Sequence, residues 1–460
     1  MNKQPNVLDW GVEELATLNL GDERRNQRLR LLVSQLAPQP AASLPQALPD
    51  QAALKAAYRF FDNTGFEEQD IIASHLLQTY QRCHQVALVL AVQDTSEIDY
   101  TEHYATTGLG HLATAKQRGL LLHTTIAFTA DGLPLGLLGQ QQWSRDLAQL
   151  GKRARRKQLP ISEKESNKWL VGLQSTNLAA AQAADTRFIA VADREADIYE
   201  LLAAPREANC ELLIRACRIR NVAGGEHLYE SVAQTQPVAR VVVQVPARNH
   251  KPARQAELAV RYHQVELKPT SRKQAALSLY AVLAEELAPP SKAEAVSWLL
   301  LTTMPLQSSN DALQMLEWYS VRWGIEVWHK VLKSGCKVEQ RQPADFERLV
   351  RMIAVYSLVA WRVQYATMLA RSGPEMSCEV VLERAEWEAL YCAVHRVAMP
   401  PRGAPSLAQA IHWLGQLGGF SGRKSDGEPG VTSIWRGLQR LRDLTTMYVI
   451  MRPPGDVGKD

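Results

Sequence analysis

Five side chains that can bind metal ions or phosphate groups recur at helical spacing late in the chain. They are Tyr319, Arg322, Glu326, Lys330 and Lys333. At about 100° per residue these positions fall within roughly an 80° arc, so a continuous helix over residues 312–333 would line them along one stripe. One carboxylate would then stand among cations and a phenol. The alternative is an ordinary exposed helix, because Arg322 with Glu326 and Glu326 with Lys330 are i,i+4 pairs.

Two aspartates each follow an apolar run of strand length. Asp94 ends the string VALVLAVQD, and Asp193 follows RFIAVA. Continuous apolar runs of this length suit strands that are buried on both faces. The ends of such strands meet the open edge of an α/β sheet, where sites commonly form. An aspartate at a strand end is otherwise a helix N-cap or a turn former.

Taken together, the three carboxylates form a metal-site hypothesis. Asp94, Asp193 and Glu326 would supply oxygen ligands of the kind that bind Mg²⁺, with Mn²⁺ as a substitute. Two such ions about 4 Å apart can activate the attacking oxygen and stabilise the leaving oxygen of a phosphodiester. The neighbouring cations would supply donors for the scissile phosphate and the phosphates beside it. The predicted chemistry is two-metal cleavage of a nucleic acid.

The periodicity of the chain predicts the elements that position these residues. Residues 1–70 predict a helical module with Asp22 as an N-cap. Apolar runs and a hairpin at Asp131-Gly132 predict an α/β core over 71–221. Alternating segments predict a β-rich insertion over 222–300. The core then resumes over 301–370 with the helix that carries Glu326, and 371–460 is predicted to be a helical region.

Basic residues cluster in places where they could follow a polyanion. Residues 145–168 hold eight basic and three acidic residues, and residues 239–273 hold eight basic and two acidic residues. The N-terminal module offers further cations, which nearby acids nearly balance. Each cluster is a phosphate-binding surface or a solvated charged face, and the N-terminal helices are equally an amphipathic cap.

Composition bounds the class of protein. The chain has 460 residues, 46% of them hydrophobic and 22% charged, with a formal net charge of +4. That length is enough for a large core and more than one domain. The six cysteines are scattered without a CxxC pair, which favours reduced thiols and argues against structural zinc. No apolar run approaches the roughly 18 residues of a membrane span, and no signal-like segment opens the chain, so we expect a cytoplasmic protein without membrane contact.

The spacing Tyr319-x2-Arg322-x3-Glu326-x6-Lys333 resembles the signature of the insertion-sequence-four family of bacterial DDE transposases, closest to its Tn-five type. Further strings support the resemblance in order along nearly the whole chain: LGDERRNQRL, AAYRFFDN, VQDTS, ESNKWL, ADREADIY, RNHKPAR and WLLLT. The resemblance implies an RNase-H-like catalytic core, an N-terminal domain that reads transposon ends and a C-terminal dimerisation region.

The resemblance also implies roles for individual residues. Asp94, Asp193 and Glu326 would be the ligands of two Mg²⁺ ions. Phosphates would be gripped by Tyr319, Arg322, Lys330, Lys333, Arg194 and Arg215. Trp298 would stack against a flipped base, although a core tryptophan at a strand start is the alternative. Other DNA contacts are expected at Arg24, Arg28, Arg59, Arg248, Lys251 and Arg254.

The implied activity is cut-and-paste transposition at inverted-repeat ends of double-stranded DNA. Water would nick one strand, the freed 3′-hydroxyl would form a hairpin, water would open it, and the 3′-hydroxyl would attack target DNA. A homodimer would hold two ends in a synaptic complex in a bacterial cytoplasm, associated with the nucleoid when bound to DNA. The alternatives are a domesticated DNA-binding descendant without catalysis and a metal nuclease that recognises DNA structure.

Two positions depart from the family's pattern. Cys217 stands where a basic residue is expected two places after Arg215, which puts one phosphate contact in doubt. The first motif has Ser96 in place of a second threonine after Asp94-Thr95. This second change leaves the predicted metal ligand untouched.

Overall fold

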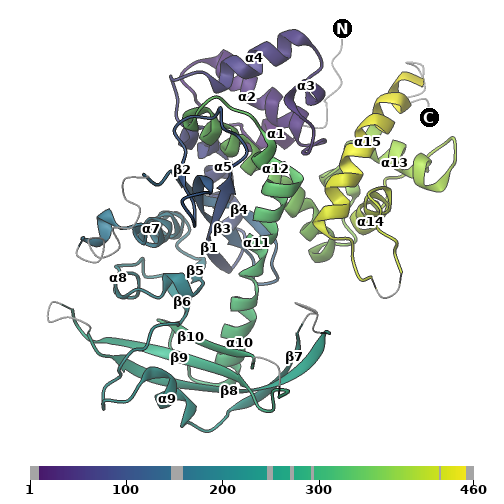
Figure 1. The fold of residues 1–460 in the computed structure, drawn as a ribbon. Helices are drawn as coiled ribbons and strands as arrows, with labels where there is room; N and C mark the ends of the chain where they lie inside the picture. Colours follow the sequence, from purple (N-terminus) through teal and green to yellow (C-terminus); the bar gives the residue numbers. More distant parts are fainter. Residues whose placement is uncertain are drawn as a thin grey trace.

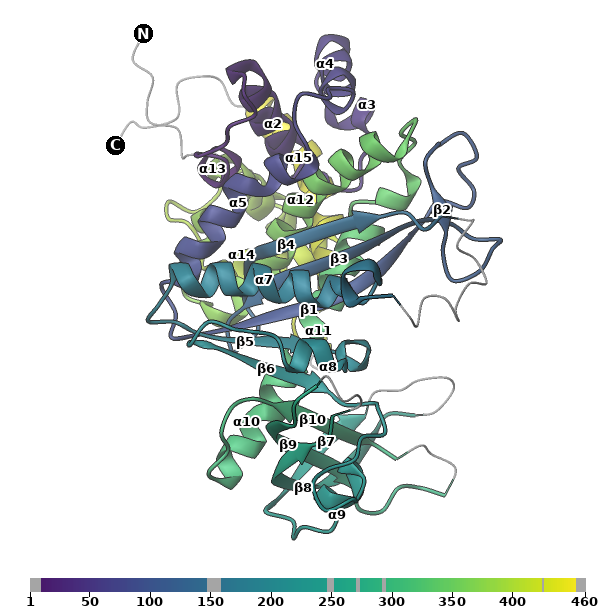
Figure 2. The same ribbon diagram turned by 90° about the vertical axis from the view of Figure 1, so that its left-hand side faces the viewer.

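The structure of the protein is a computed structural model that describes residues 10–146, 159–245, 252–269, 274–291, 295–423 and 426–451. A mixed ten-stranded sheet forms the centre of the molecule. Helices of the N-terminal region cover one end, and the C-terminal helices pack to one side (Figures 1 and 2). The predicted α/β core with a helical region on each flank is confirmed.

The N-terminal helices are amphipathic and begin at polar caps. They are α1 (Trp10–Glu14), α2 (Glu23–Leu36), α3 (Leu44–Ala47), α4 (Gln51–Phe61) and α5 (Glu68–Cys83). Asp22 caps α2 as predicted, accepting the backbone N–H of Arg24 at 2.8 Å. Asp50 caps α4 in the same way through Ala53 N–H at 2.7 Å. Such caps satisfy donors that the first helical turn leaves free.

The sheet combines antiparallel and parallel pairing. Its strands are β1 (Leu88–Asp99), β2 (Gly110–His111), β3 (Arg118–Phe128), β4 (Pro134–Trp143), β5 (Arg187–Ala192), β6 (Cys210–Arg215), β7 (Ala239–Val245), β8 (Arg254–Leu267), β9 (Leu277–Glu286) and β10 (Ser297–Thr302). Their order is β2-β3-β1-β5-β6-β10-β9-β8-β7. β4 also pairs with β3, on the edge of β3 that faces away from β1. β1 is antiparallel to β3 and parallel to β5, so it lies where the two kinds of pairing meet.

The apolar run of β1 is buried on both faces, as its sequence predicts. Leu90 and Val92 pack in the core that contains α12 (Phe346–Ser372), while Val89 and Ala91 pack in a second core. That second core includes Trp169 of α7 (Asn167–Gln182). Successive side chains of a strand point to opposite faces, so one uninterrupted apolar run serves two helical layers.

The β-rich segment continues the central sheet and does not form a separate layer. β10 pairs with β6, with Leu300 opposite Arg215, and β9, β8 and β7 follow outward. α9 (Leu228–Ala233) and α10 (Ser309–Ser320) accompany these strands at the lower end of Figure 1. A continuous hydrogen-bonded ladder therefore connects the far end of this segment to β1.

The second half of the chain is largely helical after β10. Its helices are α10, α11 (Trp323–Lys330), α12, α13 (Arg384–His395), α14 (Leu407–Leu417) and α15 (Val431–Met451). α12 is buried along most of its 27 residues, which explains why its sequence is apolar on every side. None of the helices in the described ranges is long and apolar enough to cross a bilayer. The six cysteines are all free thiols.

A buried ion pair ties the N-terminal helices to the sheet. Arg82 of α5 donates twice to the Glu14 carboxylate of α1, Nη1 to Oε2 at 2.9 Å and Nη2 to Oε1 at 2.8 Å. His75 Nδ1 lies 2.5 Å from Glu14 Oε1, and His75 Nε2 accepts the backbone N–H of Leu137 in β4 at 2.9 Å. Because Nε2 accepts, His75 is a neutral ring with its proton on Nδ1. Trp361 of α12 closes the cluster under the Arg82 guanidinium.

The contacts of Glu14 reverse the effect of its burial. Burial alone would raise the pKa of this carboxyl, but His75 and Arg82 outweigh it and lower the pKa to about 2. Burial also lowers the pKa of His75, in keeping with a neutral ring. The ionised form of Glu14 is therefore more stable in the folded chain than in the unfolded chain, so its ionisation stabilises the fold.

We expect Glu14→Gln to lower the free energy of unfolding by about 3 kcal/mol at pH 7, because it leaves Arg82 without its buried partner. The contribution of Glu14 is complete above its ordinary pKa of 4.5 and is lost as the pH falls toward about 2. Denaturant titrations of both proteins at pH 7 and pH 3.5 should show a smaller difference at the lower pH. Glu13→Gln, at an exposed neighbour, is the control. An equal difference at both pH values would contradict this account.

Candidate active site

Strand register places Asp94 and Asp193 side by side. β1 and β5 pair in parallel from Leu88 with Arg187 to Gln93 with Ala192. Asp94 follows Gln93 and Asp193 follows Ala192, so the two aspartates are the next residues along the two paired segments. Neighbouring strands lie about 4.8 Å apart. Residues separated by almost one hundred positions thus meet because of pairing alone.

Asp94 does not end its strand, which differs from the sequence prediction. β1 continues to Asp99, and Asp94 pairs with Thr124 of β3. The pairing of β1 with β5 ends just before Asp94, so the apolar run of β1 stops where β5 stops. Asp193 does end its strand, and it also caps the short turn Arg194–Ala196 by accepting Glu195 N–H at 2.9 Å. Capping and a role in a site are compatible for Asp193.

Glu326 lies on α11, from which its charge acts on Asp94, but the predicted single helix over 312–333 is wrong. α10 ends at Ser320, α11 begins at Trp323, and Val331–Gly335 form a π turn. At the break, Gly324 lies so close to β3 that a Cβ atom would stand 2.7 Å from the ring of Phe128. Val321 and Arg322, between the two helices, keep right-handed helical backbone angles, so the interruption is local.

The three acids share one electrostatic environment. Burial raises the pKa of Asp94 to about 6, against the opposing effects of Thr95 N–H and Arg322. The charges of Asp193 and Glu326 contribute to the same rise. Arg322 Nη2 donates to Glu326 Oε1 at 2.7 Å, and its side chain is only 12% exposed. The i,i+4 pair expected of an exposed helix therefore lies inside the site.

The donor set of the site fits a hard divalent cation, although the side chains do not surround one point. Within the described ranges, no three Asp, Glu, His or Cys side chains are placed to hold one ion as they stand. Arg322 Nε and His329 Nε2 are buried there without a hydrogen-bond partner in the same ranges. Carboxylate oxygens are the ligands that Mg²⁺ and Mn²⁺ favour. For all three to bind, Glu326 would have to part from Arg322.

Aromatic and basic side chains line the side of the site toward β10. The rings of Trp298 and Tyr319 meet edge to face with centroids 5.7 Å apart. Arg215, at the end of β6, donates from Nη2 to the carbonyl of Ser297 at 3.1 Å. Burial raises the pKa of Tyr319, and the charges of Arg322 and Arg215 oppose that rise. Tyr319 is buried and Trp298 is partly buried.

The other predicted phosphate contacts lie around the acids in different states. Lys330 is exposed at the end of α11, and Arg194 is exposed beside Asp193. Lys333 stands on the π turn, where its Nζ forms an ion pair with Glu339 Oε1 at 2.9 Å and donates to the Glu97 carbonyl at 2.8 Å. Lys333 is therefore held at the far end of β1.

The predicted DNA contacts outside the core are spread over two regions. Arg24, paired with Asp22, and the partly exposed Arg28 lie on α2, and Arg59 is exposed on α4. Arg254 makes a two-bond pair with Glu286, one bond being Nη2 to Oε2 at 2.9 Å. Arg248 and Lys251 lie outside the described residues, as do residues 147–158 of the basic tract over 145–168.

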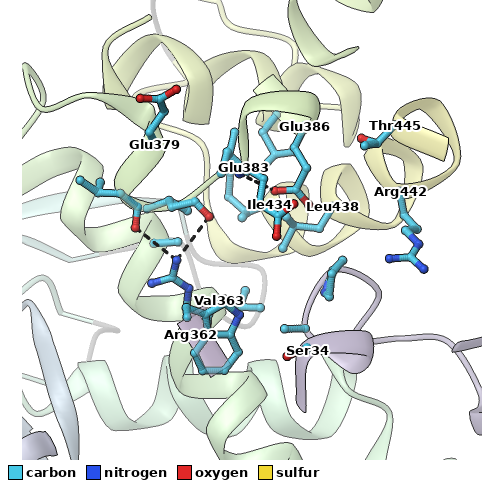
Figure 3. Close-up of a pocket in the computed structure, with 18 of the residues that line it drawn as sticks. Ser34, Arg362, Val363, Glu379, Glu383, Glu386, Ile434, Leu438, Arg442 and Thr445 are labelled. Carbon is cyan, nitrogen blue, oxygen red and sulfur yellow. Dashed lines mark hydrogen bonds between the residues drawn. The ribbon is translucent and has the colours of Figure 1, made fainter. Parts of the chain in front are cut away.

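A cavity of about 690 Å³ separates the N-terminal and C-terminal helices and contains none of the three acids. In Figure 3, Arg362 of α12 faces Glu386 of α13 across this space. Arg362 Nη2 donates to the carbonyls of Val380 and Val381 at 3.2 and 3.3 Å. Burial raises the pKa of Glu386 to about 7. The position of this cavity separates it from the phosphodiester chemistry predicted above.

Two residues at the site were missed by the sequence prediction. His329 Nδ1 lies 3.9 Å from Asp94 Oδ2, and burial lowers the pKa of His329 to about 3, so the ring is neutral. Its position three residues after Glu326 on the same helix was a signal that could have found it. Glu339, the partner of Lys333, carries no such signal, because a loop and a π turn separate it from the helix.

Comparisons with known proteins match both ends of the chain. Residues 8–65 match a family model described as transposase DNA-binding, and residues 358–449 match one described as the Tn5 transposase dimerisation domain. A cryo-EM structure of a piggyBac transposase synaptic complex with hairpin DNA is 8% identical, with a TM-score of 0.37 over 100% of this chain and 85% of that chain. A likeness this distant carries no weight for fold or function.

The π turn of Lys333 offers a test of packing at the site. A Cβ atom on Gly335 would lie 2.9 Å from Cε3 of Trp435, a buried residue of α15. We expect Gly335→Ala to lower the free energy of unfolding by about 1–3 kcal/mol, because neither the backbone nor the buried ring can move freely.

Melting curves would measure this loss against Gly403→Ala, since no atom of the described chain lies within 4 Å of a Cβ on Gly403. Adding Trp435→Leu to Gly335→Ala should recover part of the loss, because the smaller side chain makes room. Equal melting temperatures for the two single alanine variants would rule out the close contact.

Proposed function

Because the chain belongs to the Tn5-type transposases, we propose that it cuts a transposon from double-stranded DNA and joins it to a target through chemistry at Asp94, Asp193 and Glu326. The observation that carries this proposal is the β1–β5 register, which sets Asp94 beside Asp193. The effect of the Glu326 charge on Asp94 supports a shared site.

The two terminal domains support DNA and a second copy of the chain as the proposed partners. The chain carries a transposase DNA-binding domain and a dimerisation domain. We propose that the first reads inverted-repeat ends and that the second forms a homodimer, so that two ends and two sites meet in a synaptic complex. The working location would be the bacterial cytoplasm, on the nucleoid when DNA is bound.

The three acids are proposed to hold two Mg²⁺ ions, with Mn²⁺ as a substitute. Such ions, when bound, would activate the attacking oxygen and stabilise the leaving oxygen of the phosphodiester. Arg322, once parted from Glu326, would donate its planar guanidinium to a phosphate. Tyr319, Lys330, Lys333, Arg194 and Arg215 would hold that phosphate and its neighbours, as their positions around the acids support.

The proposed reaction has four steps at one site: nicking by water, hairpin formation by the freed 3′-hydroxyl, hairpin opening by water and strand transfer to target DNA. Hairpin formation requires a sharp bend, which is easier when one base leaves the stack. Trp298 is partly exposed beside Tyr319, and its ring would accept the displaced base by stacking.

A non-catalytic DNA-binding descendant is the second candidate. The Arg322–Glu326 hydrogen bond at 2.7 Å favours it, because a cation side chain occupies one of the proposed ligands. Tight binding to the ends without nicking in Mg²⁺ or Mn²⁺ would support this candidate. Equal cleavage of branched DNA and inverted-repeat ends would instead indicate a nuclease that recognises DNA structure.

Removal of any one acid should abolish cleavage. We expect Mg²⁺-dependent nicking to slow more than about a hundredfold in each of Asp94→Asn, Asp193→Asn and Glu326→Gln. The loss of a metal ligand should slow nicking more than the loss of a residue that only hydrogen-bonds to a ligand. The substrate would be a duplex with the short inverted repeats that flank the gene. Glu317→Gln, at an exposed position of α10, is the matched control for Glu326→Gln. Full cleavage by any of the three acid variants would reject the assignment.

The base-stacking role of Trp298 predicts a selective defect. Trp298→Ala should leave the first nick close to the wild-type rate and lower hairpin yield roughly tenfold, since stacking on an aromatic ring is worth about 1–3 kcal/mol per base. Trp298→Phe keeps a ring and should recover much of that yield. Gel analysis of nicked and hairpin products separates the steps, and an equal loss in both would indicate a purely structural tryptophan.

A further inference from the structure

The ammonium group of Lys333 is held in a fixed place before any DNA binds. Its Nζ forms an ion pair with Glu339 Oε1 at 2.9 Å and donates to the Glu97 carbonyl at 2.8 Å. A lysine ammonium has three N–H donors, and the described chain supplies no acceptor for the third. The side chain remains 31% exposed, so one donor is left for a group from outside.

Glu339 is itself anchored, so it can serve as a fixed support. Its Oε1 also accepts the backbone N–H of Asp99, the last residue of β1, at 3.0 Å. The Glu339 carbonyl lies 2.8 Å from His103 Nε2, and Tyr100 donates to the neighbouring Val338 carbonyl at 2.6 Å. The carboxylate is therefore fixed to the same strand that carries Asp94.

Holding Lys333 in this way has a physical benefit for a reaction that depends on geometry. A free lysine side chain samples many rotamers, and it would lose that freedom when it binds a phosphate. Glu339 and the Glu97 carbonyl restrict the Lys333 side chain before DNA binds. Misplacement of a reacting group by about 1 Å can slow a reaction a hundredfold.

We infer that Glu339 is a positioning residue that holds Lys333 with one N–H directed to a phosphate oxygen of the DNA strand at the acids. The inference rests on the proposed function. It assigns to Glu339 a task distinct from the metal ligands and from the direct phosphate contacts. Glu339 would act on the rate of cleavage through Lys333 and would contribute little to DNA affinity.

The test combines Glu339→Ala, Glu339→Gln and Lys333→Ala in the full-length protein. Single-turnover nicking of end DNA in Mg²⁺ is measured alongside DNA affinity and melting temperature. Glu339→Ala should slow nicking about 10- to 100-fold while its DNA affinity stays within about threefold of the wild type. Glu339→Gln keeps an acceptor oxygen and should recover most of the rate. Glu347→Ala removes an exposed acid from nearby α12 and is the control.

A double-mutant cycle separates positioning from mere support of the fold. Once Lys333 is absent, Glu339→Ala should slow nicking no further, so the two losses should not add. Equal slowing by Glu339→Ala with and without Lys333 would overturn the inference, as would full nicking activity of Glu339→Ala. A wild-type protein that nicks no end DNA would overturn the proposed function as well, and the two failures are thereby distinguished.

Discussion

The parallel pairing of β1 with β5 is the constraint on which the site depends. Each strand ends its shared pairing one residue before an aspartate, so the register alone fixes the separation of Asp94 and Asp193. A shift by one residue would exchange the side chains that the two helical layers receive from β1, and it would also part Asp94 from Asp193. The two hydrophobic cores and the two acids are therefore consequences of one alignment.

Like charges that lie close together in a partly buried site repel one another, and nearby cations reduce that repulsion. Asp94 lies where burial and the charges of two other acids oppose its ionisation. Arg322 compensates Glu326, and Glu339 compensates Lys333, so much of the charge of the site is matched within the chain. Each such pair keeps a charged side chain ordered near the sheet while DNA is absent. Binding of DNA or cations would exchange the partners of Arg322 and Glu326 rather than place a bare charge in the interior, while Glu339 would keep its contact with Lys333.

The sequence indicated the sheet and the two aspartates because their signal is local. An apolar run that ends in an acid specifies both a buried strand and a polar position at its limit. The close approach of Gly324 to Phe128 had no such signal, because that contact depends on the tertiary fold. The partnership of Lys333 with Glu339 was hidden for the same reason. The arginine pair with Glu326 was visible as spacing, but its burial was not.

The contact of Gly335 with Trp435 joins two modules that the domain matches treat as separate. Trp435 belongs to α15, within the segment that matches a dimerisation domain, and Gly335 lies two residues after Lys333. The helix thus packs against the turn that carries Lys333 and also belongs to the segment that matches the dimerisation domain. A chain shortened before α15 would lose the surface against which the lysine-bearing turn is packed. A truncation meant to remove the segment that matches the dimerisation domain would therefore also remove Trp435, which packs against the turn that carries Lys333.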